Sequence, residues 1–193
     1  MMQDLRNRHF DLIAFAYDRL IGPSQEAGLK EMLRLPARGW LLDAGGGTGR
    51  VSHRLRPFVD GVVVADLSRK MLRMARKKDG LECVRTRTER LPFPDRTFAR
   101  VMIVDALHHF SGVDASLAEL VRVLKPGGWI LIEEPDLSLP IVKLVAIAEK
   151  LLLMESHFRM AETISAALQA QDLLPEIRRD GRFRSRIFAE KLF

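Results

Sequence analysis

A loop with four glycines in five positions most constrains what this chain can fold into. Residues 43–49 read Asp-Ala-Gly-Gly-Gly-Thr-Gly and follow a short apolar run, Trp40–Asp43. Glycine is needed where the backbone takes a positive φ or where a ligand comes too close for a Cβ atom. A plain tight turn needs only one or two glycines, so this loop predicts a nucleotide-like ligand lying across it.

The spacing of these glycines excludes two common nucleotide-binding fingerprints. A G-x-G-x-x-G motif starting at Gly45 needs glycine or alanine where Arg50 stands, and one starting at Gly46 needs glycine where Thr48 stands. The phosphate-binding loop that ends in Gly-Lys-Ser/Thr is also absent. What remains is the pattern D-x-G-x-G-x-G, beginning at Asp43.

Apolar strands alternate with amphipathic helices along the chain. Gly61–Asp66 is the clearest strand, and Ser68 can cap the helix that follows it. The other predicted strands are Trp40–Asp43, Glu82–Thr86, Val101–Asp105 and Trp129–Glu133, and the helices are Arg69–Lys78, Ala115–Leu124 and Ala161–Leu173. Nearly all-apolar strands between helices predict a parallel sheet covered on both faces. Ile177–Arg179 and Arg184–Glu190 flank a glycine turn and predict a closing hairpin.

The predicted fold class is therefore α/β: a Rossmann-like, doubly wound, seven-stranded sheet, mostly parallel, with an antiparallel C-terminal hairpin strand. In such sheets ligands bind beyond the carboxyl ends of the strands, where the strand order reverses. Polar residues follow all five predicted parallel strands. They are Asp43 with its glycines, Asp66, the Arg87–Glu89 region, Asp105 with two histidines, and Glu133–Glu134.

The composition bears on the location of the protein and on its disulfide and metal chemistry. No stretch of about 20 residues is free of charge, so no membrane span is expected. The N-terminal residues lack the apolar core of a signal peptide, which predicts a cytoplasmic protein. Cys83 is the single cysteine, which excludes an intramolecular disulfide and a cysteine-built metal site.

The net charge of +6 permits attraction to nucleic acid, acidic lipid or anionic substrates. An arginine-rich solvated surface explains the charge equally well. The basic residues fall in dispersed clusters with few aromatics available for base stacking, namely Arg69–Lys78, Arg85–Arg90 and Arg178–Arg186. Nucleic acid is therefore an alternative partner and not the favoured one.

Five motifs in order carry a family resemblance. LLDAGGGTGR, VVVADLS, LPFPDRTF, LHHF and LKPGG resemble the class I S-adenosylmethionine-dependent methyltransferases, in particular the ubiquinone- and menaquinone-type subgroup. The resemblance covers roughly residues 10–135. It implies S-adenosyl-L-methionine as cofactor and S-adenosyl-L-homocysteine as product. Phe10–Gly22 resembles the subgroup's N-terminal segment, in which a tyrosine, here Tyr17, lies over the cofactor.

The resemblance also implies which residues bind the cofactor. The glycine loop (Gly45, Gly47 and Gly49) forms the cradle. Asp66 ends its strand 17 residues past Gly49, where a carboxylate can accept hydrogen bonds from both ribose hydroxyls. Leu67 and Met71 supply apolar faces for adenine. Asp43 orients the loop and reaches the amino-acid end of the cofactor, with a purely structural buried carboxylate as the alternative.

One position departs from the subgroup's pattern. The stretch before Leu-Pro-Phe usually reads Asp-Ala-Glu there, whereas this chain has Arg87-Thr88-Glu89. A guanidinium cannot accept a hydrogen bond from the adenine amino group. We therefore expect Arg87 to point to solvent, the Thr88 backbone to contact adenine, and Glu89 to brace the loop.

Methyl transfer is an in-line displacement for which the protein mainly aligns the reactants. His108 and His109 are the histidines at a strand exit, and we expect both to titrate near neutral pH. They are the candidates for a general base, if the nucleophile must lose a proton. A structural role is the alternative for both. Asp105 is expected near the cofactor and not as a base. Glu133, Glu134 and Asp136 alternate across strand faces, so no metal site is expected.

The organisation that follows is a single methyltransferase domain over residues 1–193. Residues 1–36 form an N-terminal helical cover, 37–136 the cofactor-binding core, 137–160 a substrate lid, and 161–193 a closing helix and hairpin. His157 and Arg159 in the lid are candidates for polar substrate contact. The predicted function is methyl transfer to a small-molecule acceptor. The alternatives are a non-catalytic module that binds the cofactor or its product, and an RNA methyltransferase.

Overall fold

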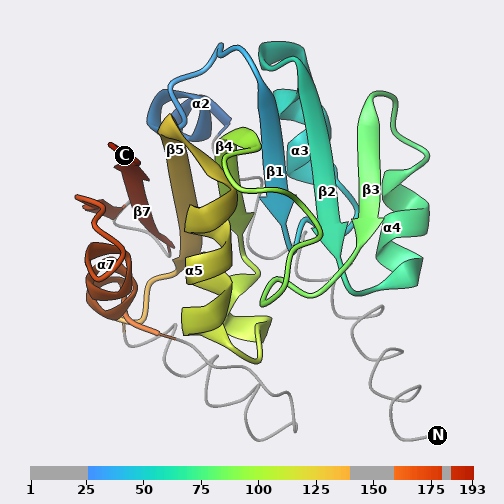
Figure 1. Ribbon diagram of the computed structural model, residues 1–193. Coiled ribbons are helices and arrows are strands. Elements are labelled where there is room, and N and C mark those ends of the chain that lie inside the picture. Colours follow the sequence, from blue (N-terminus) through green and yellow to red (C-terminus); the bar gives the residue numbers. More distant parts are fainter. Residues whose placement is uncertain (1–25, 140–158, 180–183) are drawn as a thin grey trace, which may run out of the picture.

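The computed structural model describes residues 26–139, 159–179 and 184–193 (Figure 1). Tyr17, His157, most of the expected N-terminal cover and most of the expected lid lie outside these residues. The strands are β1 (Trp40–Ala44), β2 (Gly61–Asp66), β3 (Leu81–Arg85), β4 (Phe98–Val104), β5 (Leu124–Pro135), β6 (Glu176–Arg179) and β7 (Arg184–Glu190). The helices are α2 (Glu26–Met32), α3 (Arg50–Leu55), α4 (Arg69–Ala75), α5 (Val113–Val123) and α7 (Ala161–Gln169), with short 3-10 turns η1 (Arg56–Phe58) and η2 (Leu107–His109).

The strands form one seven-stranded sheet in the order β3-β2-β1-β4-β5-β7-β6. Strands β1 to β5 run parallel, whereas β7 runs antiparallel to both β5 and β6. The predicted fold class is confirmed. The strand order reverses between β1 and β4, which places the predicted ligand cleft beyond the carboxyl ends of these two strands.

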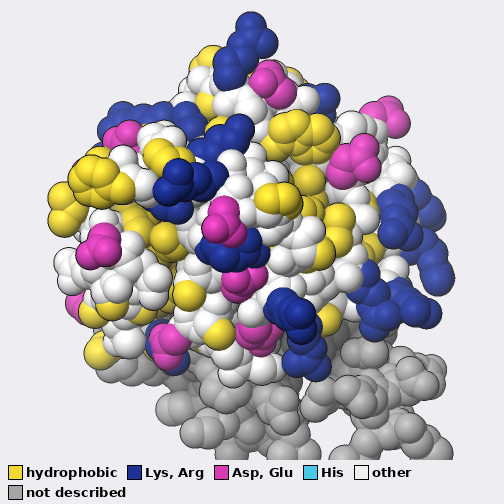
Figure 2. Space-filling view, viewed as in Figure 1, with side chains coloured by type: hydrophobic (Ala, Val, Ile, Leu, Met, Phe, Trp, Pro, Cys, Tyr) yellow, Lys and Arg dark blue, Asp and Glu magenta, His cyan; other side chains and the backbone are white. Residues whose placement is uncertain are grey.

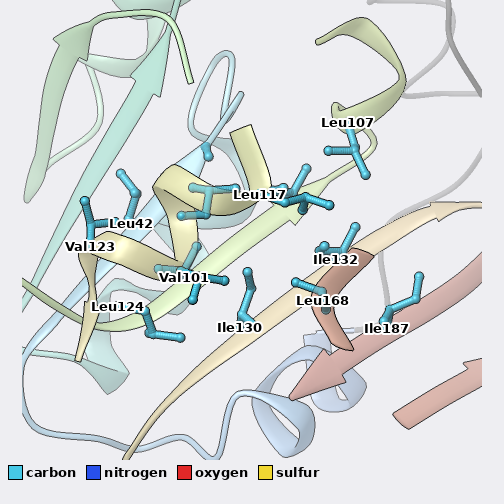
Figure 3. Packing of buried hydrophobic residues seen from close by; sticks show 14 of the residues in the cluster. Leu42, Val101, Leu107, Leu117, Val123, Leu124, Ile130, Ile132, Leu168 and Ile187 are labelled. Atoms are coloured by element: carbon cyan, nitrogen blue, oxygen red, sulfur yellow. The ribbon is translucent and has the colours of Figure 1, made fainter. Parts of the chain in front are cut away.

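Helices cover both faces of the sheet, as the uniformly apolar strands require. The larger core lies between the sheet and the pair α5 and α7, where Leu117 and Leu168 meet Val101, Ile132 and other strand residues (Figure 3). A second core joins α2 and α3 to the opposite face. A small third cluster holds α4 against β2 through Leu72, Ala75 and Val64.

Local sequence signals set several boundaries. The Ser68 side chain accepts a hydrogen bond from the Met71 amide, so it caps α4 as predicted. Residues Lys125–Gly128 lie between the helix Ala115–Leu124 and the strand Trp129–Glu133 that the sequence predicts, and their residue types predict a turn there. They instead lie within β5, where the register with β4 jumps from the Phe98–Leu124 pair to the Arg100–Trp129 pair. Backbone hydrogen bonds from Gly127 to Lys191 and from Lys191 to Gly128 hold this irregular segment in the sheet.

In the three segments that the structure describes, no helix has both the length and the apolar character that a bilayer crossing requires.

Candidate functional site

The glycine loop joins β1 to α3 at the switch point of the sheet. The Gly45 amide donates to the carbonyl of Ala65 at 2.8 Å, which ties the start of the loop to β2. Gly45 and Gly47 have φ values of 73° and 53°, in the left-handed region that favours glycine. A Cβ on Gly45 would stand 2.6 Å from the Ala106 Cβ, whereas one on Gly47 would meet, among the residues that the structure describes, only Asp66 Oδ2, at 4.0 Å. Gly45 is therefore needed for packing, and Gly47 leaves an open face above the loop.

Asp66 at the end of β2 fastens the loop to the start of α4. Its Oδ2 atom accepts a 2.9 Å hydrogen bond from the Gly47 amide, and its Oδ1 atom accepts one of 2.7 Å from the Ser68 amide. Burial raises the pKa of this carboxyl, and the backbone amides oppose the shift. Each carboxylate oxygen has two lone pairs, so each can accept a further hydrogen bond from a ligand.

Asp43 lies beneath the loop and is 2% exposed. Its Oδ2 atom accepts a hydrogen bond from the Ser52 hydroxyl on α3, and a Cβ on Gly46 would collide with the same carboxylate. Burial raises the pKa of Asp43 to about 7. The geometry therefore gives Asp43 a bracing role under the loop. A contact between Asp43 and the amino-acid end of the cofactor stays a prediction.

The residues predicted around adenine separate into two groups. Leu67 is 53% exposed and Met71 is half-buried, so both offer apolar surface next to Asp66. The Thr88 side chain points away from solvent, because its hydroxyl lies 2.9 Å from the Ser116 hydroxyl on α5. Arg87 is exposed, in agreement with its expected orientation. Glu89 accepts a hydrogen bond from the Gly112 amide before α5, which confirms its bracing role.

Asp105 and the two histidines follow β4, across the switch point from the glycine loop. Asp105 has a φ of 52°, and its buried Oδ1 atom has no hydrogen-bond partner within the described part of the chain. Burial raises the pKa of Asp105 to about 6, against the opposing effect of Arg184. His108 is 2% exposed and its Nδ1 atom lies 2.6 Å from Glu134 Oε2.

The two histidine rings lie side by side, with centroids 4.0 Å apart. Desolvation, and then the neighbouring His108 ring, lower the pKa of His109, so its imidazole is neutral at pH 7. Our expectation that His109 titrates near neutral pH was therefore wrong. A neutral imidazole can still accept a proton, so its role as a base stays a prediction.

Sequence reasoning missed the function of Glu134. Its Oε1 atom accepts hydrogen bonds from the amides of Ala106 and Leu107, at 2.9 and 2.7 Å, while Oε2 holds His108. One buried carboxylate thus fixes both the backbone of the loop after β4 and the orientation of the imidazole. The sequence signal was an acid near the end of an apolar strand, but its partner could not be read from that signal.

A second buried charge network lies on the other face of β5. Glu133 is fully buried and pairs with Arg184 and Arg186 of β7, the latter through a 2.5 Å contact between Nε and Oε2. Arg184 also approaches Asp105 Oδ2 at 3.2 Å. The antiparallel register, in which Glu133 stands opposite Arg186, creates this network. Among the described residues, no three His, Cys, Asp or Glu side chains form a group that could hold a metal ion.

Comparisons with known proteins agree with this geometry. Residues 42–132 match the family described as "Methyltransferase domain". The ubiquinone/menaquinone biosynthesis C-methyltransferase UbiE of Escherichia coli O1:K1 is 37% identical over 113 residues, which cover 53% of this chain and 44% of that protein. The chain thus spans less than half the length of the curated relatives it matches.

Solved structures show the same fold. A putative methyltransferase from Bacillus halodurans superposes with a TM-score of 0.75 at 22% identity, covering 89% of this chain and all of that chain. Geranyl diphosphate C-methyltransferase from Streptomyces coelicolor A3(2), in complex with Mg²⁺, geranyl diphosphate and S-adenosyl-L-homocysteine, gives a TM-score of 0.73 at 15% identity, covering 87% and 77%. Residues 42–132 therefore match a methyltransferase domain, and the glycine loop, the acid after β2 and the order of the motifs agree with that match.

Proposed function

We propose that this chain transfers the methyl group of S-adenosyl-L-methionine to a small-molecule acceptor. The observation that carries the proposal is the cradle at the switch point. There Gly47 presents an open face while its amide is held by Asp66, a carboxylate that can still accept hydrogen bonds. A dinucleotide fold uses an acid at the same place to hold a ribose.

The residues around the cradle fit the cofactor. Asp66 would accept the ribose hydroxyls, and the exposed Leu67 and half-buried Met71 would pack on adenine. The buried Oδ1 atom of Asp105 has no hydrogen-bond partner among the described residues, and a bound ligand can supply the donor that it needs. Bound S-adenosyl-L-methionine would supply a methyl group on a positively charged sulfur, open to in-line attack by a nucleophile.

The chain's own contribution to catalysis is then alignment and, where needed, proton transfer. Glu134 accepts from the His108 Nδ1–H, which leaves Nε2 as the nitrogen with the basic lone pair when the imidazole is neutral. The same carboxylate fixes the Ala106 and Leu107 amides, so the loop that carries both histidines keeps one conformation. Positioning of this kind is a large part of what a methyltransferase requires of its protein.

A small-molecule acceptor is supported by the relatives, two of which are named as C-methyltransferases of quinone biosynthesis and of geranyl diphosphate. The non-catalytic binding module and the RNA methyltransferase are the competing functions. The division into cover, core, lid and closing hairpin, and a cytoplasmic location, stay predictions from the sequence.

Isothermal titration calorimetry tests which cofactor the chain binds. S-adenosyl-L-methionine and S-adenosyl-L-homocysteine should bind, NAD should not, and Asp66→Asn should weaken binding by about 1–3 kcal/mol because charge-assisted hydrogen bonds are lost. Asp60→Asn is the matched control, since Asp60 also accepts a backbone amide, that of Gly39, but beside the opposite end of β1 and β2. Equal losses in both variants would refute the site.

Transfer is tested with S-adenosyl-L-methionine labelled in its methyl group. The purified chain is incubated with a small-molecule extract or with total RNA, and the label is followed into each fraction. Label in the extract, reduced by Asp66→Asn, supports the proposal. Label in RNA alone identifies an RNA methyltransferase, and cofactor binding without transfer to either fraction identifies a binding module.

A further inference from the structure

One segment of the chain accounts for its excess of positive over negative charge. Residues 69–90 contain nine Lys or Arg and three Asp or Glu, so this segment alone accounts for the formal net charge of +6. Two clusters that look separate in the sequence, Arg69–Lys78 and Arg85–Arg90, come together because α4 packs on β2 and the edge strand β3. Figure 2 shows Lys and Arg side chains gathered over this edge of the molecule.

The third basic cluster of the sequence behaves differently. Arg178 pairs with Glu31 at 2.7 Å, and Arg179 pairs with Glu162. Arg184 and Arg186 share the buried Glu133. The charges of these C-terminal arginines are thus matched by carboxylates of the chain itself.

On α4 and β3, four arginines line one groove of about 300 Å³ with Leu72. Arg69, Arg73 and Arg76 follow one another at intervals of four and three residues, which places them along one face of the helix. Their side chains make no hydrogen bond or ion pair within the described part of the chain. Arg85 reaches the groove from the end of β3, and its Nε donates to the Leu67 carbonyl at 2.9 Å.

This arrangement has the properties of an anion site. Like charges around one groove repel one another, and a bound anion removes that cost while accepting the guanidinium donors. The bond from Arg85 to Leu67 fixes one guanidinium in advance and uses one of its five N–H donors. We propose that this groove binds a compact polyphosphate anion, at a site separate from the cradle for the cofactor.

The dimensions favour two or more linked phosphates. The three arginines of α4 span about 10 Å of helix at 1.5 Å per residue, so a lone phosphate would reach only some of them. Guanidinium groups bind phosphate oxygens two at a time in a planar fork. The lining residues include no aromatic side chain on which a nucleic-acid base could stack, which favours a small anion over a single-stranded RNA. None of them is a residue assigned to the cofactor.

Inorganic triphosphate is the probe for a binding experiment on the full chain at low ionic strength. We expect measurable binding to the wild-type chain and at least a tenfold loss in Arg73→Ala/Arg76→Ala. The control is Arg38→Ala/Arg54→Ala, which removes the same charge from exposed arginines outside the groove and should change the affinity less than twofold. Circular dichroism melts confirm that both variants are folded.

Several outcomes would overturn the proposal. Absence of triphosphate binding, or equal losses in the two double variants, would show that no local site exists. Groove-dependent binding of a ten-residue RNA, or of phosphatidylglycerol vesicles, without triphosphate binding would replace the small anion with a macromolecular surface. Because the assay measures binding and needs no methyl transfer, its outcome is independent of the proposed enzymatic function.

Discussion

The imidazole of His108 in η2, which follows β4, and the carboxylate of Glu134 near the end of β5 form a buried pair, with Nδ1 and Oε2 2.6 Å apart. The same carboxylate accepts two amides of the loop after β4. This residue therefore connects the stability of the fold to the geometry of the candidate catalytic loop.

Replacing Glu134 tests that connection. Glu134→Ala leaves two buried amides and the imidazole without their acceptor, so we expect a loss of about 3 kcal/mol in the free energy of unfolding. Glu134→Gln keeps one acceptor oxygen and should cost less. Urea unfolding measures both. The exposed Glu82→Ala is the control, expected within about 0.5 kcal/mol of wild type. If Glu134→Ala lost no more stability than the Glu82→Ala control, the structural role of the His108–Glu134 pair would be contradicted.

Substitutions at Gly45 and Gly47 of the glycine loop should have different effects, the first on the stability of the fold and the second on cofactor binding. Gly45→Ala places a Cβ 2.6 Å from Ala106 at a φ of 73°, so it should destabilise the fold by about 1–3 kcal/mol. The methyl group of Gly47→Ala has no close contact among the described residues, so its cost comes mainly from the φ of 53°, about 1 kcal/mol. Yet Gly47→Ala should lose cofactor affinity, because its methyl enters the cradle. Thermal melts measure the stability of both variants, and calorimetry measures their affinity for the cofactor. Unchanged affinity in Gly47→Ala would contradict the proposed cradle.

The buried Asp43 should make stability depend on pH. Its pKa rises from 3.8 to about 7 in the folded state, so the folded chain holds the proton more tightly than the unfolded chain between these values. Wild-type stability relative to Asp43→Asn should therefore fall as pH rises from about 4 to 7, by a few kcal/mol at 1.36 kcal/mol per pKa unit, and then level off. Urea unfolding at several pH values measures this difference. A difference independent of pH would contradict a raised pKa.

Arg87 and Thr88 should matter little for the cofactor. Arg87 is exposed, so Arg87→Ala should change cofactor affinity by less than about 0.5 kcal/mol. Thr88→Val removes the buried hydroxyl pair with Ser116 and should cost about 1 kcal/mol of stability. Its backbone stays in place, so its affinity should also be close to that of wild type. A large loss of affinity in Arg87→Ala would assign that side chain a direct contact.

The sequence predicted the central strands because those signals are local. The strand Gly61–Asp66 contains three consecutive valines and ends on an acid, and the structure gives it the same bounds. The Ser68 cap and the bracing role of Glu89 were readable for the same reason. Residues whose roles depend on distant partners were not readable. Glu134 finds His108 through the parallel pairing of β4 and β5, and Glu133 finds Arg186 through an antiparallel register set by the hairpin.

Local signals also misled at one place. Lys125-Pro126-Gly127-Gly128 has the residue types of a turn, and the turn chemistry is present in the φ of 70° at Gly127. Pairing with Lys191 nevertheless keeps the segment inside β5. Tertiary hydrogen bonds thus decided where the strand begins.

The placement of Arg184 and Arg186 on β7 has a consequence for local opening. If this strand detached while the rest stayed folded, Glu133 would lose both arginines that pair with it, and Asp105 would lose Arg184. Such an opening is far more costly than fraying of an ordinary terminal strand. The amide hydrogens of Ile187 and Phe188 should accordingly exchange with solvent at the rate of global unfolding, so that the C-terminal strand belongs to the same cooperative unit as the site.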